Sequence, residues 1–301
     1  MQTRVGSVTF PNPVLTASGT SGYGAELGAY VDLGTLGGVV VKSLSATPWA
    51  GNPAPRVHET VGGMINSVGL HNGGVAEWLT DHLPALRRSG ARVVASIWGR
   101  TIADYAGAAA MLADAGPEVV AVEVNLSCPN LDGGRHLFSQ SPTETAEVIA
   151  ACAPCGRPRW AKLTPNVTDI TAIAGAALEA GAEAVTLINT VMGLAIDSTH
   201  RSPWLAAGSG GLSGPAIHPI AVRAVYECRA AFPGASIVGV GGVARGIDAV
   251  ELLEAGADAV QVGTATFADP RAPARILSEV RRWCMAAGTH RLADLIGAAH
   301  A

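Results

Sequence analysis

Short apolar runs alternate with longer segments of helical periodicity along almost the whole chain. The runs are β-branched and nearly continuous, which is typical of strands in a parallel sheet that is buried on both faces. They predict eight strands, at residues 14–18, 38–42, 92–97, 119–124, 159–163, 184–188, 236–240 and 259–262. The segments between them predict helices at residues 24–33, 74–88, 102–115, 142–151, 168–180, 219–231, 247–255 and 272–285.

An internal repeat supports units made of one helix and one strand. Residues 178–185 read LEAGAEAV, and residues 253–260 read LEAGADAV. Each copy joins a helix end to a strand start, with glycine where a left-handed residue commonly ends a helix. Eight such units predict an α/β fold, a single (β/α)8 TIM barrel in one domain over residues 1–301. An open doubly wound sheet is the alternative, but its glycine fingerprint is absent after the first strand, where the sequence reads ASGTSG.

Three predicted connections are longer than minimal turns, at residues 43–72, 127–141 and 190–215. They are the long covering loops after strands 2, 4 and 6. All three follow the carboxyl ends of strands, where barrel enzymes build their active sites. Their glycine, proline, asparagine and serine content is typical of ordered loops. Residues 5–10 predict a short hairpin that closes the other end of the barrel.

The composition favours a large apolar core and excludes several classes of protein. The chain has 301 residues, of which 49% are hydrophobic and 15% charged, so disorder is not expected. A net charge of −4 and 5% aromatic residues argue against nucleic-acid binding. No apolar run is long enough to span a membrane, and the first residues resemble neither a secretory signal nor a membrane-docking extension. We therefore expect a cytoplasmic protein with neither a nucleic-acid nor a membrane partner.

The five cysteines do not indicate a disulfide framework, because their number is odd and the chain is long. Cys152 and Cys155 have the spacing of a redox motif. They lie where a helix is predicted to end, however, whereas a redox pair normally opens a helix. No second pair completes a four-ligand metal site, so we expect no metal.

Glycines at the ends of the last two strands predict a phosphate site. Residues 238–243 read VGVGGV, and residues 261–265 read QVGTA. Glycine alone could serve only the tight turns. Barrels commonly bind phosphate at this pair of strands, however, and glycine lets the backbone approach an anion closely. Many phosphate-bearing metabolites would fit, ribulose phosphates and FMN among them.

Lysines and carboxamides gather at other strand ends. Lys42 and Lys162 each end an apolar strand, where an ammonium group is costly unless its charge is used or paired. A lysine that snorkels to the barrel rim is the alternative. Asn66 and Asn189 lie in or beside the long loops. Together with Lys42, such amides could bind a cyclic diamide that carries a carboxylate.

The segment Asn125-Leu-Ser-Cys-Pro-Asn130 is the most informative in the chain. It follows a buried strand and leads into a loop with two adjacent glycines. A thiol stands there between two carboxamides, which can bind a planar ring edge while Cys128 moves a proton. A structural cysteine in a turn would explain Cys128 alone, but it would not require these neighbours.

These motifs resemble those of the dihydroorotate dehydrogenases, FMN-containing barrels of pyrimidine (UMP) biosynthesis. The resemblance covers residues 12 to about 267, and it is carried by segments 125–130, 51–56, 63–70, 162–167, 188–190 and 210–216. The chain is most similar to class 1B because residues 190–197, TVMGLAID, resemble that branch more than the fumarate-reducing class 1A. Class 2 enzymes usually carry serine as the base and have a membrane-docking extension.

The resemblance implies a flavoprotein oxidoreductase that converts (S)-dihydroorotate to orotate. Cys128 would take the C5 proton, and FMN would accept the hydride from C6. The implied FMN-binding residues are Ser18, Lys42, Ser43, Asn125, Lys162, Ile188, Gly214, Gly241, Gly242, Gly263 and Thr264. The implied substrate-binding residues are Lys42, Asn66, Ser67, Val68, Gly69, Leu70, Asn125, Asn130, Asn189 and Thr190.

Two positions depart from the family pattern. Ser96 stands where relatives usually have an asparagine that touches the flavin. Serine is shorter and has only one hydroxyl, so this contact is expected to be lost or bridged by water. His71 stands where relatives usually have glutamine, which changes the substrate-side wall.

Class 1B membership also implies partners. Such enzymes pass electrons to a separate subunit with FAD and a [2Fe–2S] cluster, and finally to NAD. This chain has neither a four-cysteine cluster motif nor a dinucleotide fingerprint, so it would need that subunit. The family also implies a homodimer. Three alternatives stay open: a fumarate-linked enzyme or one acting on another dihydropyrimidine, a flavin-free barrel for a sugar phosphate, and a non-catalytic binding barrel.

Overall fold

The computed structural model describes residues 1–127 and 137–300. Eight parallel strands form its centre: β3 (Val14–Thr16), β4 (Val39–Val40), β7 (Val93–Ile97), β8 (Val119–Asn125), β9 (Arg159–Leu163), β10 (Ala184–Leu187), β15 (Ser236–Val240) and β16 (Ala259–Val262). The outermost strands β3 and β4 close the sheet, because the Thr16 amide donates to Gly38 O at 3.1 Å and the Gly37 amide to Val14 O at 2.8 Å. The predicted (β/α)8 barrel is therefore confirmed.

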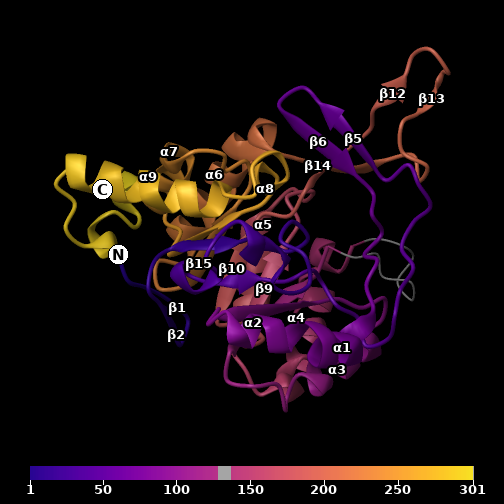
Figure 1. The fold of residues 1–301 in the computed structure, drawn as a ribbon, viewed down its shortest axis with the longest axis horizontal. Coiled ribbons are helices and arrows are strands. Elements are labelled where there is room, and N and C mark those ends of the chain that lie inside the picture. Colours follow the sequence, from indigo (N-terminus) through magenta and orange to yellow (C-terminus); the bar gives the residue numbers. More distant parts are fainter. Residues whose placement is uncertain (128–136, 301) are drawn as a thin grey trace.

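Helices cover the outside of the barrel (Figure 1). They are α1 (Gly74–Glu77), α2 (Leu83–Arg88), α3 (Ile102–Met111), α4 (Pro142–Ala151), α5 (Ile170–Glu179), α6 (His218–Ala231), α7 (Gly246–Glu254), α8 (Ala265–Ala268) and α9 (Ala272–Ala286). Helix α4 begins at Pro142, and Ser141 Oγ accepts from the Glu144 amide at 3.3 Å, as an N-cap residue does. None of the helices in these residues is both long and apolar enough to cross a membrane.

The helix predicted at residues 24–33 is wrong. That stretch holds only two 3₁₀ turns, Glu26–Ala29 and Leu33–Thr35. The Glu26 carboxylate accepts from the Tyr23 and Gly24 amides at 3.2 and 2.7 Å, and this local turn competes with a helix. Glycines within the stretch weaken the helix further.

The helix predicted at residues 74–88 forms with one irregular turn. A π-helical segment, Trp78–His82, separates α1 from α2. Pro84 is the second residue of α2, and because it lacks an amide hydrogen it cannot complete the regular hydrogen-bond pattern. Trp78 is buried at this turn, and its Nε1 donates to Tyr23 O at 2.7 Å.

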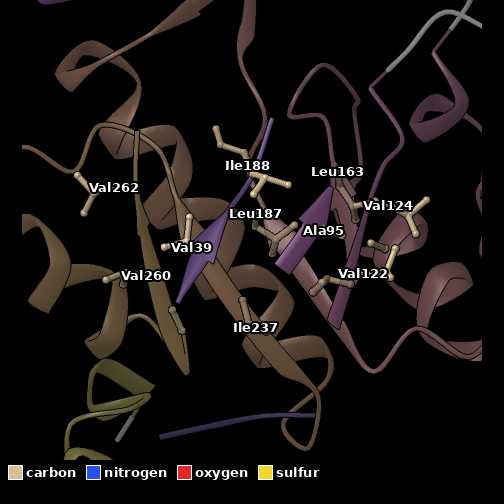
Figure 2. Close-up of a cluster of buried hydrophobic side chains, with 14 of the residues drawn as sticks. Val39, Ala95, Val122, Val124, Leu163, Leu187, Ile188, Ile237, Val260 and Val262 are labelled. Atoms are coloured by element: carbon tan, nitrogen blue, oxygen red, sulfur yellow. The ribbon is translucent and has the colours of Figure 1, made fainter. Parts of the chain in front are cut away.

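The main apolar core lies between the barrel and its helices. Outward-facing strand residues such as Val122, Leu187 and Val260 belong to one buried cluster (Figure 2). The same cluster includes helix residues such as Leu252 and Ile276. A smaller cluster fills the barrel around Phe10 and Trp160, whose rings meet edge to face. Both faces of each strand are thus buried, which explains the nearly continuous apolar runs in the sequence.

A hairpin closes the amino-terminal end of the barrel, as predicted. Strands β1 (Thr3–Val5) and β2 (Val8–Phe10) pair antiparallel, and Val5 and Phe10 belong to the cluster inside the barrel. This end is sealed with apolar side chains, so access to the interior is from the carboxyl ends of the strands.

The loops after the second and sixth barrel strands form a sheet that sequence reasoning missed. It has the order β11-β14-β6-β5, with β5 (Val57–Thr60), β6 (Gly63–Asn66), β11 (Val191–Gly193) and β14 (Gly210–Ser213). A further hairpin, β12 (Ile196–Asp197) with β13 (Ser202–Pro203), projects beside it. In Figure 1, β5, β6 and β14 lie on the opposite side of barrel strands β9, β10 and β15 from β1 and β2. The sheet therefore belongs to the mouth of the barrel.

Candidate active site

The inward-facing positions of the barrel change from apolar to polar along the strands. Alternate residues of a strand face the same side, so the positions two residues beyond the apolar inner cluster also face inward. Six of these eight positions carry polar residues, and the other two are Ala17 and Val240. We call the six the polar layer: Lys42, Ser96, Glu123, Lys162, Thr186 and Gln261. All except Lys42 are buried. The polar layer lies between the apolar inner cluster and the mouth, where barrel enzymes bind their ligands.

Asn125 ends β8 and connects several predicted site residues. Its Nδ2 donates to Ser43 Oγ at 3.3 Å, and its Oδ1 accepts from Asn189 Nδ2 at 3.1 Å. Ser43 in turn shares a hydrogen bond of 2.9 Å with Ser96 Oγ. The structure thus brings four predicted residues, which lie in or shortly after four different barrel strands, into one network. It also fixes Asn125 from behind, because Tyr105 OH donates to the Asn125 carbonyl at 2.6 Å.

Lys162 lies in the polar layer with a partner that sequence reasoning missed. Its Nζ is 3.3 Å from Glu123 Oε1 and 3.4 Å from Ser18 Oγ. The other carboxylate oxygen, Oε2, accepts from Gln261 Nε2 at 2.7 Å. Glu123 is the one charged residue within the run 119–124, and its alternation with Ala121 and Asn125 could have placed it inside the barrel.

Lys42 approaches the same mouth from β4. The backbone amide of Lys42 donates to Gly22 O at 3.0 Å, and a Cβ placed on Gly19 would lie 3.7 Å from Lys42 Nζ. The Lys42 side chain therefore passes beside the loop that holds Ser18. Lys42 and Lys162 are the only lysines in a chain with 20 basic residues, and all the others are arginines. A compact ammonium group rather than a guanidinium fork thus stands at both mouth positions.

The glycine turn after β15 leaves no space for a larger side chain. Gly241 and Gly242 have φ angles of +140° and +72°, and a Cβ on Gly242 would lie 2.9 Å from the Cα of His218. His218 shares a hydrogen bond of 2.8 Å between its Nδ1 and the Gly241 carbonyl. Ile188 packs in the apolar core, and its backbone amide donates to Val240 O at 2.7 Å beside this turn.

Gly214, Gly263 and Thr264 lie at the adjoining corner. Thr264 Oγ1 donates to Ser213 Oγ at 2.8 Å, which ties the end of β16 to the sheet over the mouth. A Cβ on Gly214 would lie 2.7 Å from the Cα of Gly63, and one on Gly263 would lie 3.3 Å from the Ala17 Cβ. Gly214 and Gly263 thus leave little space for a larger side chain at this corner.

Residues 66–70 line the mouth from the covering sheet. Asn66 Nδ2 donates to Gly211 O at 3.2 Å, across the pair β6 and β14. Asn52 holds the next turn, because its Nδ2 donates to Ser67 Oγ at 2.7 Å and its amide to Val68 O at 3.1 Å. Gly69 and Leu70 both have positive φ, +69° and +61°, so the segment turns tightly there. His71 follows with an exposed side chain.

Asn166 is a second functional neighbour that sequence reasoning missed. Its Nδ2 donates to Thr190 O at 3.1 Å and to Thr164 Oγ1 at 2.6 Å. Thr190 is also fixed by its own amide, which donates to Asn189 Oδ1 at 2.8 Å. Asn166 belongs to the segment 162–167 that carried the family resemblance, so Asn166 could have been found from that motif. Cys128 and Asn130 lie outside the described residues.

The pair Cys152 and Cys155 has no features of a redox site. Both thiols are buried, and burial, with a smaller contribution from Cys155, raises the pKa of Cys152 to about 12. The thiol is therefore protonated at neutral pH and unreactive. This agrees with the position of the pair at the end of α4 rather than at the start of a helix.

Asp248 stabilises the chain just beyond the glycine turn. Its Oδ2 accepts from the amides of Ala244 and Arg245 at 3.0 and 2.8 Å. Burial raises the pKa of this carboxyl, but the Arg245 side chain and these amides outweigh burial, so the pKa is lowered overall. A lowered pKa means that the stabilisation is complete above the unfolded-state pKa and is lost as the pH falls through the folded-state pKa.

We therefore expect Asp248→Asn to lower the free energy of unfolding at pH 7 by about 1 kcal/mol, the usual size of a lost capping interaction. The difference from the unchanged protein should shrink below about pH 4, near the ordinary pKa of aspartate. Urea unfolding at several pH values measures it. Asp32→Asn is the matched control, because Asp32 caps an exposed 3₁₀ turn far from this corner. A difference for Asp248→Asn that persists undiminished at acid pH would contradict the role of its charge.

The fold and the mouth together define a barrel protein of the enzyme type, with a glycine-rich corner beside a buried polar network. Comparison with known proteins identifies the family. Residues 1–283 match the family model described as dihydroorotate dehydrogenase. The chain belongs to the dihydroorotate dehydrogenase family, so the family predicted from sequence is confirmed.

Three similar relatives illustrate the relationship. The catalytic subunit of dihydroorotate dehydrogenase B (NAD(+)) from Trichlorobacter lovleyi is 46% identical over 99% of this chain and 98% of its own. The protein of the same name from Geobacter sulfurreducens is 44% identical over 99% and 97%. A putative dihydroorotate dehydrogenase A (fumarate) from Solibacter usitatus is 48% identical over 99% and 97%. The near full-length match to B catalytic subunits agrees with the predicted class 1B.

Proposed function

We propose that this protein oxidises (S)-dihydroorotate to orotate as the FMN-bearing catalytic subunit of an NAD-linked enzyme. One observation carries the proposal. The network of Asn125, Ser43 and Asn189 and the ammonium of Lys162 belong to the same barrel mouth as the glycine corner at Gly241 and Gly263. An anionic cofactor and a planar amide substrate can therefore be bound side by side.

The glycine corner and the polar layer fit FMN. Gly214, Gly241, Gly242, Gly263 and Thr264 would hold the phosphate, because glycine lets backbone amides approach an anion closely. Ser18, Lys42, Ser43, Ser96, Asn125, Lys162 and the backbone of Ile188 would hold the ring. FMN, when bound, supplies the two-electron chemistry by accepting a hydride from the substrate. The role of Lys162 is to hold a positive charge beside the ring.

The substrate would be bound by the covering segments and by Asn125. Lys42 would bind its carboxylate, and the carboxamides of Asn66 and Asn189 would bind the edges of its diamide ring. The other substrate-binding residues in the proposal are Ser67, Val68, Gly69, Leu70, Asn130 and Thr190. Cys128 would accept the C5 proton as the general base. Its acceptor role and that of Asn130 stay predictions, since both residues lie outside the described part of the chain.

Electrons would leave through a partner. The sequence has neither a four-cysteine cluster motif nor a dinucleotide fingerprint, and relatives of the same length are named catalytic subunits. We infer an electron-transfer subunit with FAD and a [2Fe–2S] cluster, and a homodimer of the catalytic chain. The single-domain assignment for residues 1–301 also stays a prediction.

The cofactor proposal is tested by purifying the protein gently and releasing its chromophore with heat or acid. We expect a yellow protein that releases FMN, with about one FMN per chain. A colourless protein that does not take up added FMN would contradict the proposal. That outcome would favour the flavin-free phosphate barrel or the non-catalytic barrel.

The electron acceptor is tested with fumarate, quinone and NAD in turn, NAD also in the presence of the electron-transfer subunit of a similar enzyme. We expect NAD to be reduced only when that subunit is present. The Solibacter usitatus relative named for fumarate gives the alternative a specific basis. Rapid reduction of fumarate by the catalytic chain alone would favour that alternative.

A further inference from the structure

We propose that Glu123 is a positioning residue for Lys162, and that the pair sets the reduction potential of the bound flavin. The proposal rests on the FMN site proposed above. Its basis is the buried set formed by Glu123, Lys162 and Gln261 in the polar layer, which none of the predicted site roles includes beyond Lys162 itself.

Glu123 and Lys162 form an ion pair that is removed from solvent. The Glu123 side chain is 0% exposed and that of Lys162 6%, and Nζ lies 3.3 Å from Oε1. Both carboxylate oxygens are used, because Oε2 accepts from Gln261 Nε2 at 2.7 Å. The carboxylate thus fixes the ammonium inside the barrel, and Ser18 Oγ at 3.4 Å is a second partner of Nζ from the loop after β3.

The position of this pair is not explained by stability. A buried ion pair is often no more stabilising than apolar side chains of the same size, because two charges lose their hydration. The layer just below is filled with Trp160 and other apolar residues, so the barrel interior can be packed without charges. Glu123 stands two residues before Asn125 on the same face of β8, at the next inward-facing position below it. The charges therefore lie where they act on a ligand in the mouth.

Electrostatics gives the direction of the effect. Reducing a flavin adds negative charge, so an ammonium nearby favours the reduced form and a carboxylate behind it opposes that preference. A low-dielectric interior makes both influences stronger than they would be in water. Glu123 therefore has two consequences for Lys162: it fixes the Nζ position and it offsets part of the positive field that reaches the ring.

Gln261 reduces the effective negative charge of the Glu123 carboxylate. Its Nε2 donates to Glu123, and its Oε1 has no hydrogen-bond partner in the described part of the chain. An amide at position 123 could still accept from Lys162 and could donate to that free Gln261 oxygen. Glu123→Gln is therefore an isosteric change that removes one negative charge. Gln261→Met has the opposite consequence, because it removes a donor that partly neutralises the carboxylate.

The test is the midpoint potential of the bound flavin, measured by anaerobic titration against reference dyes. We expect Glu123→Gln to favour the reduced form about tenfold, a rise of about 30 mV for a two-electron couple. Gln261→Met should shift the potential in the opposite direction by a smaller amount. Asp258→Asn is the control, since it breaks the Arg229 ion pair, of 3.0 Å, near the start of β16. It should lower the melting temperature and leave the potential unchanged.

The two variants with opposite expected signs separate an electrostatic role from general damage. Shifts of the same sign in both, or an equal shift in Asp258→Asn, would overturn the inference. So would unchanged potentials in Glu123→Gln and Gln261→Met that retain FMN. If the unchanged protein binds flavin and the variants give one of these results, only this inference is overturned. An unchanged protein that binds no flavin would overturn the proposed function as well.

Discussion

Replacing Cys128 with alanine is expected to slow reduction of the bound flavin by dihydroorotate by roughly 10²- to 10⁴-fold, the usual contribution of a general base. FMN content should stay unchanged, because none of the proposed flavin-holding groups is removed. Anaerobic stopped-flow mixing measures the rate directly, since it separates flavin reduction from the later transfer of electrons to an acceptor.

Two variants sharpen this prediction. Cys128→Ser should retain part of the activity, because related sites use serine as the base. Cys152→Ala is the matched control, since its thiol is buried beside α4 with a pKa raised to about 12 by burial. It should reduce flavin at the unchanged rate. A Cys128→Ala protein as fast as the unchanged one would show that the proton goes elsewhere.

Replacing Lys162 with methionine should have the second largest effect. It should lower both the free energy of unfolding and the affinity for FMN. The change leaves the Glu123 carboxylate buried without its cation, which typically costs about 3–5 kcal/mol. The same change removes a positive charge proposed to lie beside the flavin ring, so FMN should dissociate more readily. Urea unfolding of the apoprotein and fluorescence titration with FMN measure the two effects separately.

The double variant Lys162→Met with Glu123→Leu should recover most of the lost stability, because neither charge is then buried, but it should not recover FMN binding. Arg223→Met is the control for loss of a cation, because its ion pair with Glu227 is exposed and worth at most about 1 kcal/mol. If Lys162→Met were no less stable than Arg223→Met, the buried Glu123 carboxylate would not need Lys162 as its cation.

Much of the fold could be predicted because strands that are buried on both faces have mostly apolar sequences. Strands such as β7 and β15 are covered by helices outside and by other strands inside, so their apolar runs are almost uninterrupted. The sheet over the mouth could not be found in this way. Its strands are short and partly exposed, and β6 is held by β14, which follows much later in the chain. Such a pairing depends on where the barrel brings two loops together.

The candidate site was predictable wherever an unusual residue stood at a strand end. Lys42, Lys162 and Asn125 fall in this class, and the structure places them at one mouth. Glu123 was missed because a run of valines around it was interpreted by its average character, which hides the alternation of inward and outward positions. Asn166 was missed because asparagine after proline is common in turns, and only the fold shows that it bonds Thr190.

The most direct test of the whole account is to mix the purified, flavin-bearing protein with dihydroorotate in the absence of oxygen and record its absorbance spectrum. We expect the oxidised-flavin band to bleach within one turnover and one orotate to form per flavin. A flavin band that persists in the presence of saturating dihydroorotate would contradict it.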